Sequence, residues 1–489
     1  MGIRCDLTSD TCTRHTVSSL GQERGPHLRV ANGRALLGIT DGNNQSTVAV
    51  YACTLDFQSC TKTVIGSGEH VSDIRLARVP ASGDIYATGR ARSRGSINVL
   101  SRCSSTLTGC SYADIVDSAS KLSRGDNGFE PVAAGTPGGS VAFVSFAEGA
   151  EVAGHTCTGS ACTRKFRVPG FGGGVAHWPA RNTFAFAIQG TAIGNSSTLG
   201  IALCKDTDSV CSIQDATLGK GGANIRPIVL PDATGAELVV VHEGTDRGRL
   251  EPLITTCDAQ GTNCAVRYPF PLTADGHFGL DAKRAPDGSV LLSTASAGRV
   301  LLTRCPASGG TCATVDVGAT PPAFEDSLRG TALVVRPGGA NVFVGSATGA
   351  EMFSCETGQP CTRRVLPINS PAEDAPLWLT AAADQSHDAV YVALFRRGHI
   401  GFQFVARYDF FSDLELYRCA SNGALCELVL KKADVNAGAL IDDGAPASAP
   451  TWSGRPASLA VEQGIGIVRV TTTDAGNLFR PIVLEFDTY

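Results

Sequence analysis

The chain is poor in the features that mark membrane proteins and nucleic-acid binders. Methionine occurs twice and tryptophan three times among 489 residues, and only 18% of residues are charged. No apolar run approaches the roughly 18 residues of a membrane-spanning helix. The net charge of −5 gives no electrostatic reason to expect nucleic acid or an anionic membrane as a partner.

Two further absences concern targeting and catalysis. The chain starts Met1-Gly2-Ile3-Arg4, without a charged segment followed by an apolar one, so we expect that a signal peptide has been removed. No Gly-x-Ser-x-Gly nucleophile elbow occurs, and every cysteine has a nearby cysteine to pair with. Nucleophilic acyl chemistry is therefore disfavoured.

What the sequence has instead is cysteine, in close pairs. Seven pairs are separated by 7 residues, one by 6 and one by 5, and consecutive pairs follow one another about every fifty residues. An internal period of this length is typical of solenoids, propellers and arrays. The nine pairs are Cys5/Cys12, Cys53/Cys60, Cys103/Cys110, Cys157/Cys162, Cys204/Cys211, Cys257/Cys264, Cys305/Cys312, Cys355/Cys361 and Cys419/Cys426.

Disulfides explain these pairs better than zinc does. Structural zinc usually takes two closer Cys-x(2–4)-Cys pairs per ion, and an odd number of pairs would leave one over. Residues directly opposite in an antiparallel hairpin have the Cα spacing that a disulfide needs, and turn formers such as Ala420-Ser421-Asn422-Gly423 lie between the cysteines. We therefore expect one stapled hairpin per repeat and an oxidising compartment: secreted, periplasmic or at the cell surface.

The residues between the cysteine pairs predict short strands. The stretch that leads to Cys103 contains the runs 73–79, 84–88 and 96–100, separated by turn formers such as Pro80-Ala81-Ser82-Gly83. Four short strands in about fifty residues, without helical periodicity, indicate an all-β protein. On this period and strand count the whole chain resembles the β-propeller superfamily, although no fingerprint of a specific propeller family occurs.

The resemblance implies one propeller domain over residues 1–489. Nine four-stranded blades fit the repeat, with residues 1–20 supplying the last strand or strands of a closing blade and 440–489 supplying the others; seven or eight blades is the alternative. The run Ile3-Arg4 and the C-terminal run 482–486 compete for the third-strand position of that blade. Residues 396–412 are extra material before Cys419 and are expected to form an inserted hairpin or loop.

In a propeller, the beginning of each first strand borders the central channel, so residues repeated there are candidates for a ligand site. Guanidinium groups would bind carboxylates, sulfates or phosphates, and aromatic rings would stack on a planar or sugar face. Glu130 and His177 are candidate acid–base residues. The ligand-binding candidates are Arg29, Arg75, Arg226, Arg329 and Arg455, with Trp178, Phe278 and Trp378.

A structural interpretation of the same residues competes with the functional one. Each arginine could pair with a carboxylate of a neighbouring blade, for which Asp73, Glu130 and Asp281 are available, and the aromatic side chains could fill the channel. No cofactor is predicted. Structural calcium is conceivable at 41–44, 206–208, 241–246 or 442–444, although none of these has the spacing of a known calcium loop.

Three functions remain open. We expect a monomeric binding module that takes an anionic ligand, or one with a sugar or aromatic face, such as a glycan or small molecule, at the channel mouth. The alternative is a propeller hydrolase or lyase with Glu130 and His177 as its acid–base pair and Arg75 and Arg226 as its oxyanion clamps. The third is a structural surface protein without a pocket.

Overall fold

The computed structural model describes most strands of the chain and part of its turns. The described residues are 2–6, 11–15, 27–31, 34–41, 47–54, 58–67, 71–78, 84–91, 97–107, 110–114, 140–147, 151–158, 161–169, 172–191, 198–216, 227–244, 247, 251–271, 277–306, 309–320, 331–345, 350–366, 377–384, 388–399, 409–422, 424–432, 435–436, 458–462, 467–474 and 480–487. They divide into two compact units. We call Val17–Tyr268 the middle unit, and Met1–Thr16 with Pro269–Tyr489 the terminal unit.

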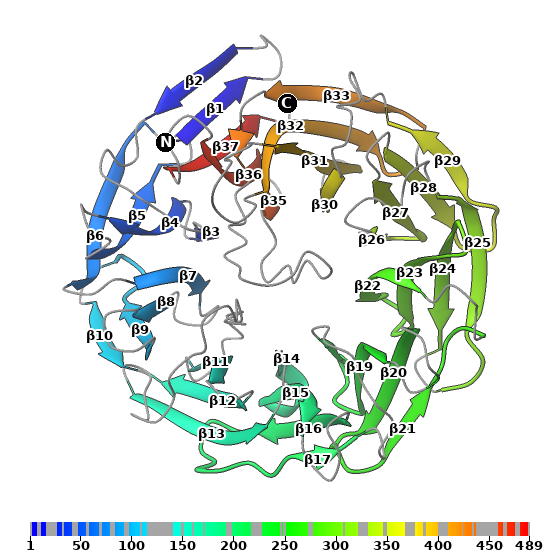
Figure 1. Ribbon diagram of the computed structural model, residues 1–489, viewed down its shortest axis with the longest axis horizontal. Coiled ribbons are helices and arrows are strands. Elements are labelled where there is room, and N and C mark those ends of the chain that lie inside the picture. Colours follow the sequence, from blue (N-terminus) through cyan, green and yellow to red (C-terminus); the bar gives the residue numbers. More distant parts are fainter. Residues whose placement is uncertain are drawn as a thin grey trace. The chain divides into compact units, whose positions relative to one another are not determined.

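The middle unit contains five antiparallel sheets among the described residues, and in each the strands pair in chain order (Figure 1). The third sheet has three strands in the described part; the segment 115–139 before it, which includes Glu130, lies outside. The strands are β3 (His27–Ala31), β4 (Arg34–Asp41), β5 (Thr47–Cys53) and β6 (Cys60–Ser67); β7 (Val71–Arg78), β8 (Ile85–Ala91), β9 (Ile97–Cys103) and β10 (Ser111–Asp114); β11 (Ser140–Ala147), β12 (Glu151–Thr158) and β13 (Ala161–Pro169); β14 (Gly172–Trp178), β15 (Thr183–Thr191), β16 (Thr198–Cys204) and β17 (Gln214–Asp215); and β18 (Ile228–Pro231), β19 (Glu237–Gly244), β20 (Glu251–Asp258) and β21 (Cys264–Arg267).

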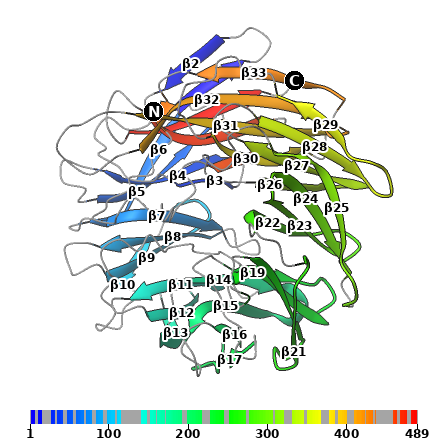
Figure 2. The same cartoon turned by 45° about the vertical axis from the view of Figure 1, so that its right-hand side comes forward.

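The terminal unit contains three four-stranded antiparallel sheets and one six-stranded sheet among the described residues (Figure 2). The four-stranded sheets are β22 (Phe278–Arg284), β23 (Val290–Ser296), β24 (Arg299–Cys305) and β25 (Ala313–Ala319); β26 (Thr331–Arg336), β27 (Gly339–Gly345), β28 (Ala350–Glu356) and β29 (Thr362–Val365); and β30 (Leu377–Asp384), β31 (Ala389–His399), β32 (Asp409–Ala420) and β33 (Cys426–Lys432). The six-stranded sheet holds β1 (Gly2–Asp6), β2 (Thr11–His15), β34 (Val435–Asn436), β35 (Ser458–Glu462), β36 (Ile467–Asp474) and β37 (Arg480–Asp487).

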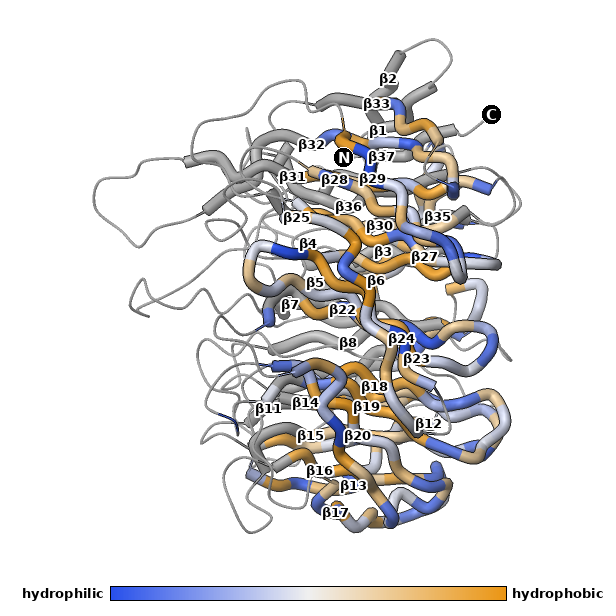
Figure 3. The backbone as a smooth tube through the Cα atoms, turned by 90° about the vertical axis from the view of Figure 1, so that its right-hand side faces the viewer, coloured by the Kyte–Doolittle hydropathy of each residue, from blue (hydrophilic) through white to orange (hydrophobic). Residues whose placement is uncertain are grey.

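Hydrophobic clusters join four pairs of neighbouring sheets: β11–β13 with β14–β17, β14–β17 with β18–β21, β22–β25 with β26–β29, and β26–β29 with β30–β33. Every residue of the central strand β23 is buried, whereas most of the outer strand β25 is exposed. Phe166 of β13 meets Phe186 of β15 edge to face, with ring centroids 5.1 Å apart, so one hydrophobic cluster joins two sheets. Figure 3 follows the same pattern, with hydrophobic residues along the strands and hydrophilic residues in many of the turns.

A Pro-Asp-Gly turn connects the first two strands of the first terminal-unit sheet. Between β22 and β23 the segment Ala285-Pro286-Asp287-Gly288 closes with a hydrogen bond from the Gly288 amide to the Ala285 carbonyl oxygen, 2.9 Å long. Gly288 has a φ of 84°, a left-handed conformation that costs glycine no steric strain. Successive sheets of four short antiparallel strands, packed through their faces, are β-propeller blades, and the expected all-β propeller fold is confirmed.

Disulfides close the last hairpin of eight sheets, as the cysteine spacing predicts. In seven of them the Cα atoms are 3.9 to 4.2 Å apart, because the two cysteines face each other across a hairpin or its turn. In the eighth, Cys204–Cys211, they are 5.7 Å apart. The eight described disulfides are Cys53–Cys60, Cys103–Cys110, Cys157–Cys162, Cys204–Cys211, Cys257–Cys264, Cys305–Cys312, Cys355–Cys361 and Cys419–Cys426.

The second cysteine of a pair does not always lie in a strand, which corrects the expectation of direct partners in the ladder. Cys162 does lie opposite Cys157 in the ladder of β12 and β13. Cys110, Cys312 and Cys361, however, each come one residue before their strand, since β10 begins at Ser111, β25 at Ala313 and β29 at Thr362. All four of these second cysteines are partly exposed, whereas their partners are buried. The spacing therefore predicts the bonded pair, but not whether its second cysteine belongs to the strand or to the turn.

The ninth cysteine pair, Cys5 and Cys12, lies in the six-stranded sheet. Cys5 and Cys12 are direct partners in the β1–β2 ladder, although their side chains lie outside the described part. No cysteine is free among the described residues. The ninth disulfide stays a prediction that the strand register favours.

The six-stranded sheet contains strands from both ends of the sequence. β1 pairs in parallel with β37, Gly2 opposite Val483, and β2 pairs with β1 in turn. The competition between Ile3-Arg4 and 482–486 for one position is thereby resolved, because both runs form strands of the same sheet. The sheet has six strands and not the four expected of a closing blade, and its strand β34 precedes the expected segment 440–489. One domain of nine blades closed by this sheet stays a prediction.

The extra residues before Cys419 lengthen one hairpin. β31 and β32 remain paired as far as His399 opposite Asp409, past a register shift at Arg396 and Arg397. Residues 400–408 lie outside the described part. The described residues contain no helix that could cross a membrane; their single helix is the 3-10 turn Pro179–Arg181.

Candidate ligand-binding site

The structure describes the predicted site residues to different extents. Glu130, Arg226, Arg329 and Arg455 lie outside the described residues. For Arg29, Arg75, Phe278 and Trp378 the strand position is described, and for His177 and Trp178 the side chain as well. Of the possible calcium segments, 442–444 lies outside, and no group of three or more metal-binding side chains occurs among the residues described.

Two aromatic candidates of the terminal unit occupy the same level of their sheets. Phe278 begins β22 and Trp378 is the second residue of β30. Each pairs with a residue of the second strand of its sheet, which in turn pairs with a residue of the third strand. In both sheets that third-strand residue lies five positions before the first cysteine of the pair, Cys305 or Cys419. The two aligned rows are Phe278, Ala295 and Val300, and Trp378, Phe395 and Leu414.

The first strands of the terminal unit are neighbours. β22 contacts β26, β26 contacts β30, and β30 contacts β35, so the beginnings of four first strands follow one another along the unit. In the sequence, Arg329 shortly precedes Thr331, where β26 begins, and Arg455 shortly precedes Ser458, where β35 begins. Each of these four first strands therefore has one aromatic or arginine candidate at or just before its beginning.

Side-chain contacts join the first two of these strands. The Asp281 carboxylate of β22 accepts a 2.9 Å hydrogen bond from the backbone amide of Leu333 in β26. Lys283 lies 3.4 Å from the other oxygen of that carboxylate. Asp281 was expected as a partner for an arginine; among the described residues it instead holds the backbone of the next sheet, where a first strand has no ladder partner on its open edge.

Buried polar and aromatic groups lie close to the beginning of β22. His277 is 1% exposed and stacks on Phe270, with ring centroids 4.4 Å apart. Ser293 of β23 and Thr331 of β26 share a 2.8 Å hydrogen bond between their hydroxyl groups. The stack of His277 on Phe270 was not predicted from the sequence, although the prolines on either side of Phe270 signal a stiff backbone there.

The candidates of the middle unit do not share one level. Arg29 pairs with Leu36, near the turn between the first and second strands, whereas Arg75 pairs with Thr88, farther from that turn. Trp178 is the last residue of β14. The expectation that Trp178 marks the beginning of a first strand is wrong, since the turn at Pro179 follows it directly.

Trp178 has a structural role. Its side chain is 0% exposed, and the indole N–H donates to the carbonyl oxygen of Asp232, at 2.9 Å, and to its carboxylate, at 3.1 Å. Burial raises the pKa of Asp232, but hydrogen bonds from Thr234 and from nearby backbone amides lower it by more. The ring face therefore packs inside the protein, between the β14–β17 and β18–β21 sheets.

His177 is partly buried beside Trp178. Its ring lies 5.4 Å from that of Phe184, and its Nε2 is buried without a hydrogen-bond partner among the described residues. Burial lowers the pKa of His177, and the charge of Asp206 opposes that shift. The acid–base pairing of His177 with Glu130 stays a prediction.

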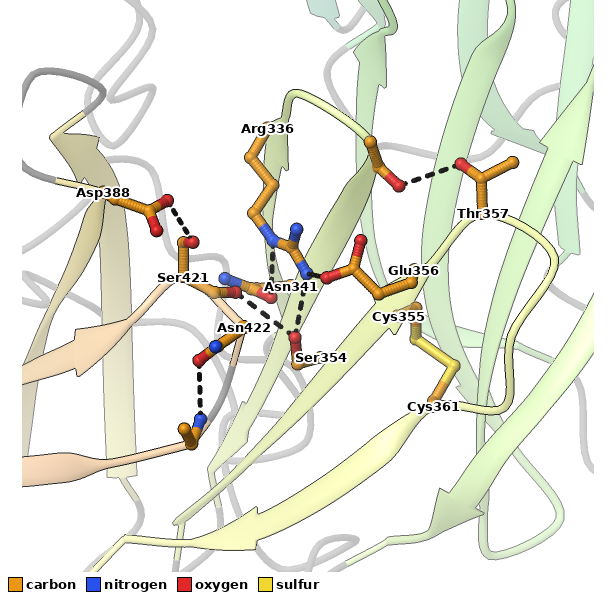
Figure 4. Close-up of polar contacts among 12 residues, drawn as sticks. Arg336, Asn341, Ser354, Cys355, Glu356, Thr357, Cys361, Asp388, Ser421 and Asn422 are labelled. Atoms are coloured by element: carbon orange, nitrogen blue, oxygen red, sulfur yellow. Dashed lines mark hydrogen bonds and ion pairs between the residues drawn. A yellow bond between two sulfur atoms is a disulfide. The ribbon is translucent and has the colours of Figure 1, made fainter.

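The opposite, disulfide-bearing ends of the sheets are occupied by structural polar contacts. Figure 4 shows Arg336 at the centre of one such network, where it forms an ion pair with Glu356 and donates to Ser354 at 3.0 Å. Ser354 donates in turn to the carbonyl oxygen of Ser421 in the next sheet, at 3.2 Å. Comparable ion pairs at this end join Arg102 to Asp84 and Arg304 to Asp287.

The structure also reveals a paired arginine in the middle unit that the sequence did not indicate. Arg247 forms two hydrogen bonds with the buried carboxylate of Glu251 and lies 3.9 Å from the ring centroid of Tyr268. The positive charge is thus neutralised and stacked on an aromatic face. The sequence signal is weak, because Arg247 lies between β19 and β20 whereas Tyr268 follows β21.

Comparisons with known proteins do not assign the chain to a family. No family model matches the chain, and no curated protein matches it. It is similar to a structure from a study of two prolyl endopeptidases, at 12% identity and a TM-score of 0.38, covering 76% of this chain and 54% of that one. It is also similar to the β-propeller domain of the Trilobed protease from Pyrococcus furiosus, at 11% identity and a TM-score of 0.37, covering 72% of this chain and 100% of that one.

A third similar structure is a puromycin hydrolase variant in complex with PGG. The identity is 11% and the TM-score 0.40, with 85% of this chain and 66% of that one covered. The chain thus spans about half the length of the prolyl endopeptidase structure and two thirds of the hydrolase. Similarities at these scores carry no argument about the activity of the chain.

Proposed function

We propose that the protein is a binding module of an oxidising compartment and takes a ligand at the beginnings of β22, β26, β30 and β35. The ligand has a sugar or planar aromatic face and carries negative charge. The observation that carries this proposal is the common level of Phe278 and Trp378 in two sheets separated by the β26–β29 sheet.

The chemistry follows from the residues at and before these strands. Aromatic rings bind the apolar faces of sugars and planar groups, and arginines such as Arg329 and Arg455 would hold carboxylate or sulfate groups through paired N–H donors. The disulfide-bearing ends are poorer candidates, because Arg102, Arg304 and Arg336 already have carboxylate partners there. The eight disulfides support an oxidising compartment.

The test is a binding screen of the whole chain with oligogalacturonate, a heparin hexasaccharide and inorganic sulfate, read by thermal shift and titration calorimetry. With the saccharide that binds, Trp378→Ala and Arg329→Ala are each expected to weaken affinity about tenfold or more, since stacking and paired hydrogen bonds are lost. Trp178→Phe is the control, because that indole belongs to β14 of the middle unit and is fully buried.

Two results would contradict the proposal. One is that none of the three probes binds the wild-type chain. The other is that a probe binds but Trp378→Ala and Arg329→Ala retain wild-type affinity, which would assign the ligand to another surface.

A further inference from the structure

A buried ammonium group lies between two sheets of the middle unit. Lys165 belongs to β13 and is 0% exposed. Its Nζ donates to two backbone carbonyl oxygens of the Cys204–Cys211 loop, that of Asp206 at 2.9 Å and that of Asp208. A lysine is seldom fully buried unless its charge is paired and hydrogen-bonded, so this loop supplies the ammonium with its environment.

The loop is folded so that its oxygens meet the ammonium. The backbone amide of Lys205 donates to the Asp208 carboxylate at 2.7 Å, and the amide of Asp208 donates to the carbonyl oxygen of Lys205 at 3.2 Å. The amide of Cys211 donates to the carbonyl oxygen of Lys165 at 2.8 Å. Lys165 is thus held by its backbone as well as its side chain.

The charges around the group favour a cation. Burial lowers the pKa of Lys165 by more than the negative charges of Asp208 and Asp206 raise it, so the aspartates offset only part of the cost of burying the charge. The sequence pattern Asp206-Thr207-Asp208-Ser209 is one of the segments considered for calcium. Calcium needs six to eight oxygens, whereas an ammonium needs only acceptors for its three N–H donors.

We propose that the Cys204–Cys211 loop is a binding site for a primary ammonium ion, and that the chain fills this site with its own Lys165. The two carbonyl oxygens accept directional hydrogen bonds, and the two aspartates supply the compensating charge. The site accordingly selects an N–H donor and does not bind calcium, although its sequence suggests a calcium loop.

Substitution of Lys165 by alanine tests the site directly. Lys165→Ala removes three methylene groups and the amine, which n-propylammonium has the size and donors to replace. We expect a lower melting temperature for this variant, and expect ~50 mM n-propylammonium chloride to restore part of the loss by mass action. Three control solutions should restore none of the loss: sodium chloride at the same ionic strength, calcium chloride at the same ionic strength, and n-propanol at ~50 mM.

The matched control is Lys205→Ala in the same loop. The Lys205 side chain is exposed, so this variant should keep the wild-type melting temperature and show no response to n-propylammonium. The proposal is overturned if calcium stabilises Lys165→Ala as much as n-propylammonium does, if n-propylammonium has no effect on that variant, or if Lys165→Ala melts like the wild type.

A measurement on the wild-type chain covers the case in which Lys165→Ala does not fold. Brief acetylation with acetic anhydride, followed by peptide mass spectrometry, should modify Lys205 at least about tenfold more than Lys165, because a buried, hydrogen-bonded amine is out of reach of the reagent. Equal modification of the two lysines in the folded chain would overturn the proposal.

Discussion

Acidification is expected to destabilise the protein through a buried histidine. His155 of β12 is 3% exposed, and burial lowers its pKa to about 4. The unfolded chain binds the same proton with a pKa of about 6.5. Because the unfolded state takes up the proton first, stability from the neutral ring is complete above pH 6.5 and is lost as the pH falls toward 4.

The size of the loss follows from the two pKa values. Linkage gives about 1.2 kcal/mol at pH 5.5 and about 2.4 kcal/mol at pH 4.5, relative to pH 7. His155→Gln removes the titrating ring. On acidification, the unfolding free energy of this variant should therefore fall by less than that of the wild type, and the difference should equal these amounts. Other ionisable groups contribute equally to both proteins and cancel in the difference.

The assay is urea unfolding at pH 7.0, 5.5 and 4.5 without reductant, followed by far-ultraviolet circular dichroism. His177→Gln is the comparison variant, because His177 is only partly buried and Asp206 opposes the lowering of its pKa, so its pH-dependent difference should be smaller. Parallel pH profiles for wild type and His155→Gln would refute the reasoning.

Two further substitutions test contacts between neighbouring sheets. Trp178→Phe removes the indole donor to Asp232 and should lower the unfolding free energy by about 1–3 kcal/mol, since a buried acceptor loses its partner; unchanged urea unfolding would contradict the structural role of this indole. Gly174→Ala would place a Cβ 2.4 Å from the carbonyl oxygen of Pro227, so we expect a loss of about 1–3 kcal/mol from the overpacked strand contact, measured by the same unfolding experiment; an alanine variant as stable as wild type would show that β14 and β18 are not packed this closely.

Local features of the fold could be predicted from the sequence, because they depend on residues close together in the chain. A disulfide such as Cys257–Cys264 closes a hairpin whose turn lies between its two cysteines, so spacing alone fixes the pair. The turn before Ser289 likewise has its Pro-Asp-Gly signal within four residues. Such pairs and turns need no information from other sheets.

The site was less predictable, because it depends on strand register. Alignment of the repeats predicts Trp178 at the beginning of a strand, yet the turn at Pro179 places it at the end. That proline was the signal that could have corrected the alignment. Contacts between sheets, such as that of Asp281 with the Leu333 amide, join residues far apart in the sequence, so no local pattern indicates them.

The short span of each disulfide bears on how such a chain changes during evolution. Since both cysteines of a pair belong to one sheet, duplicating or deleting the gene segment for that sheet adds or removes a complete pair. No thiol elsewhere is orphaned by the event, and no existing bond has to exchange partners. The number of sheets can therefore change between related proteins without disturbing the formation of the remaining disulfides.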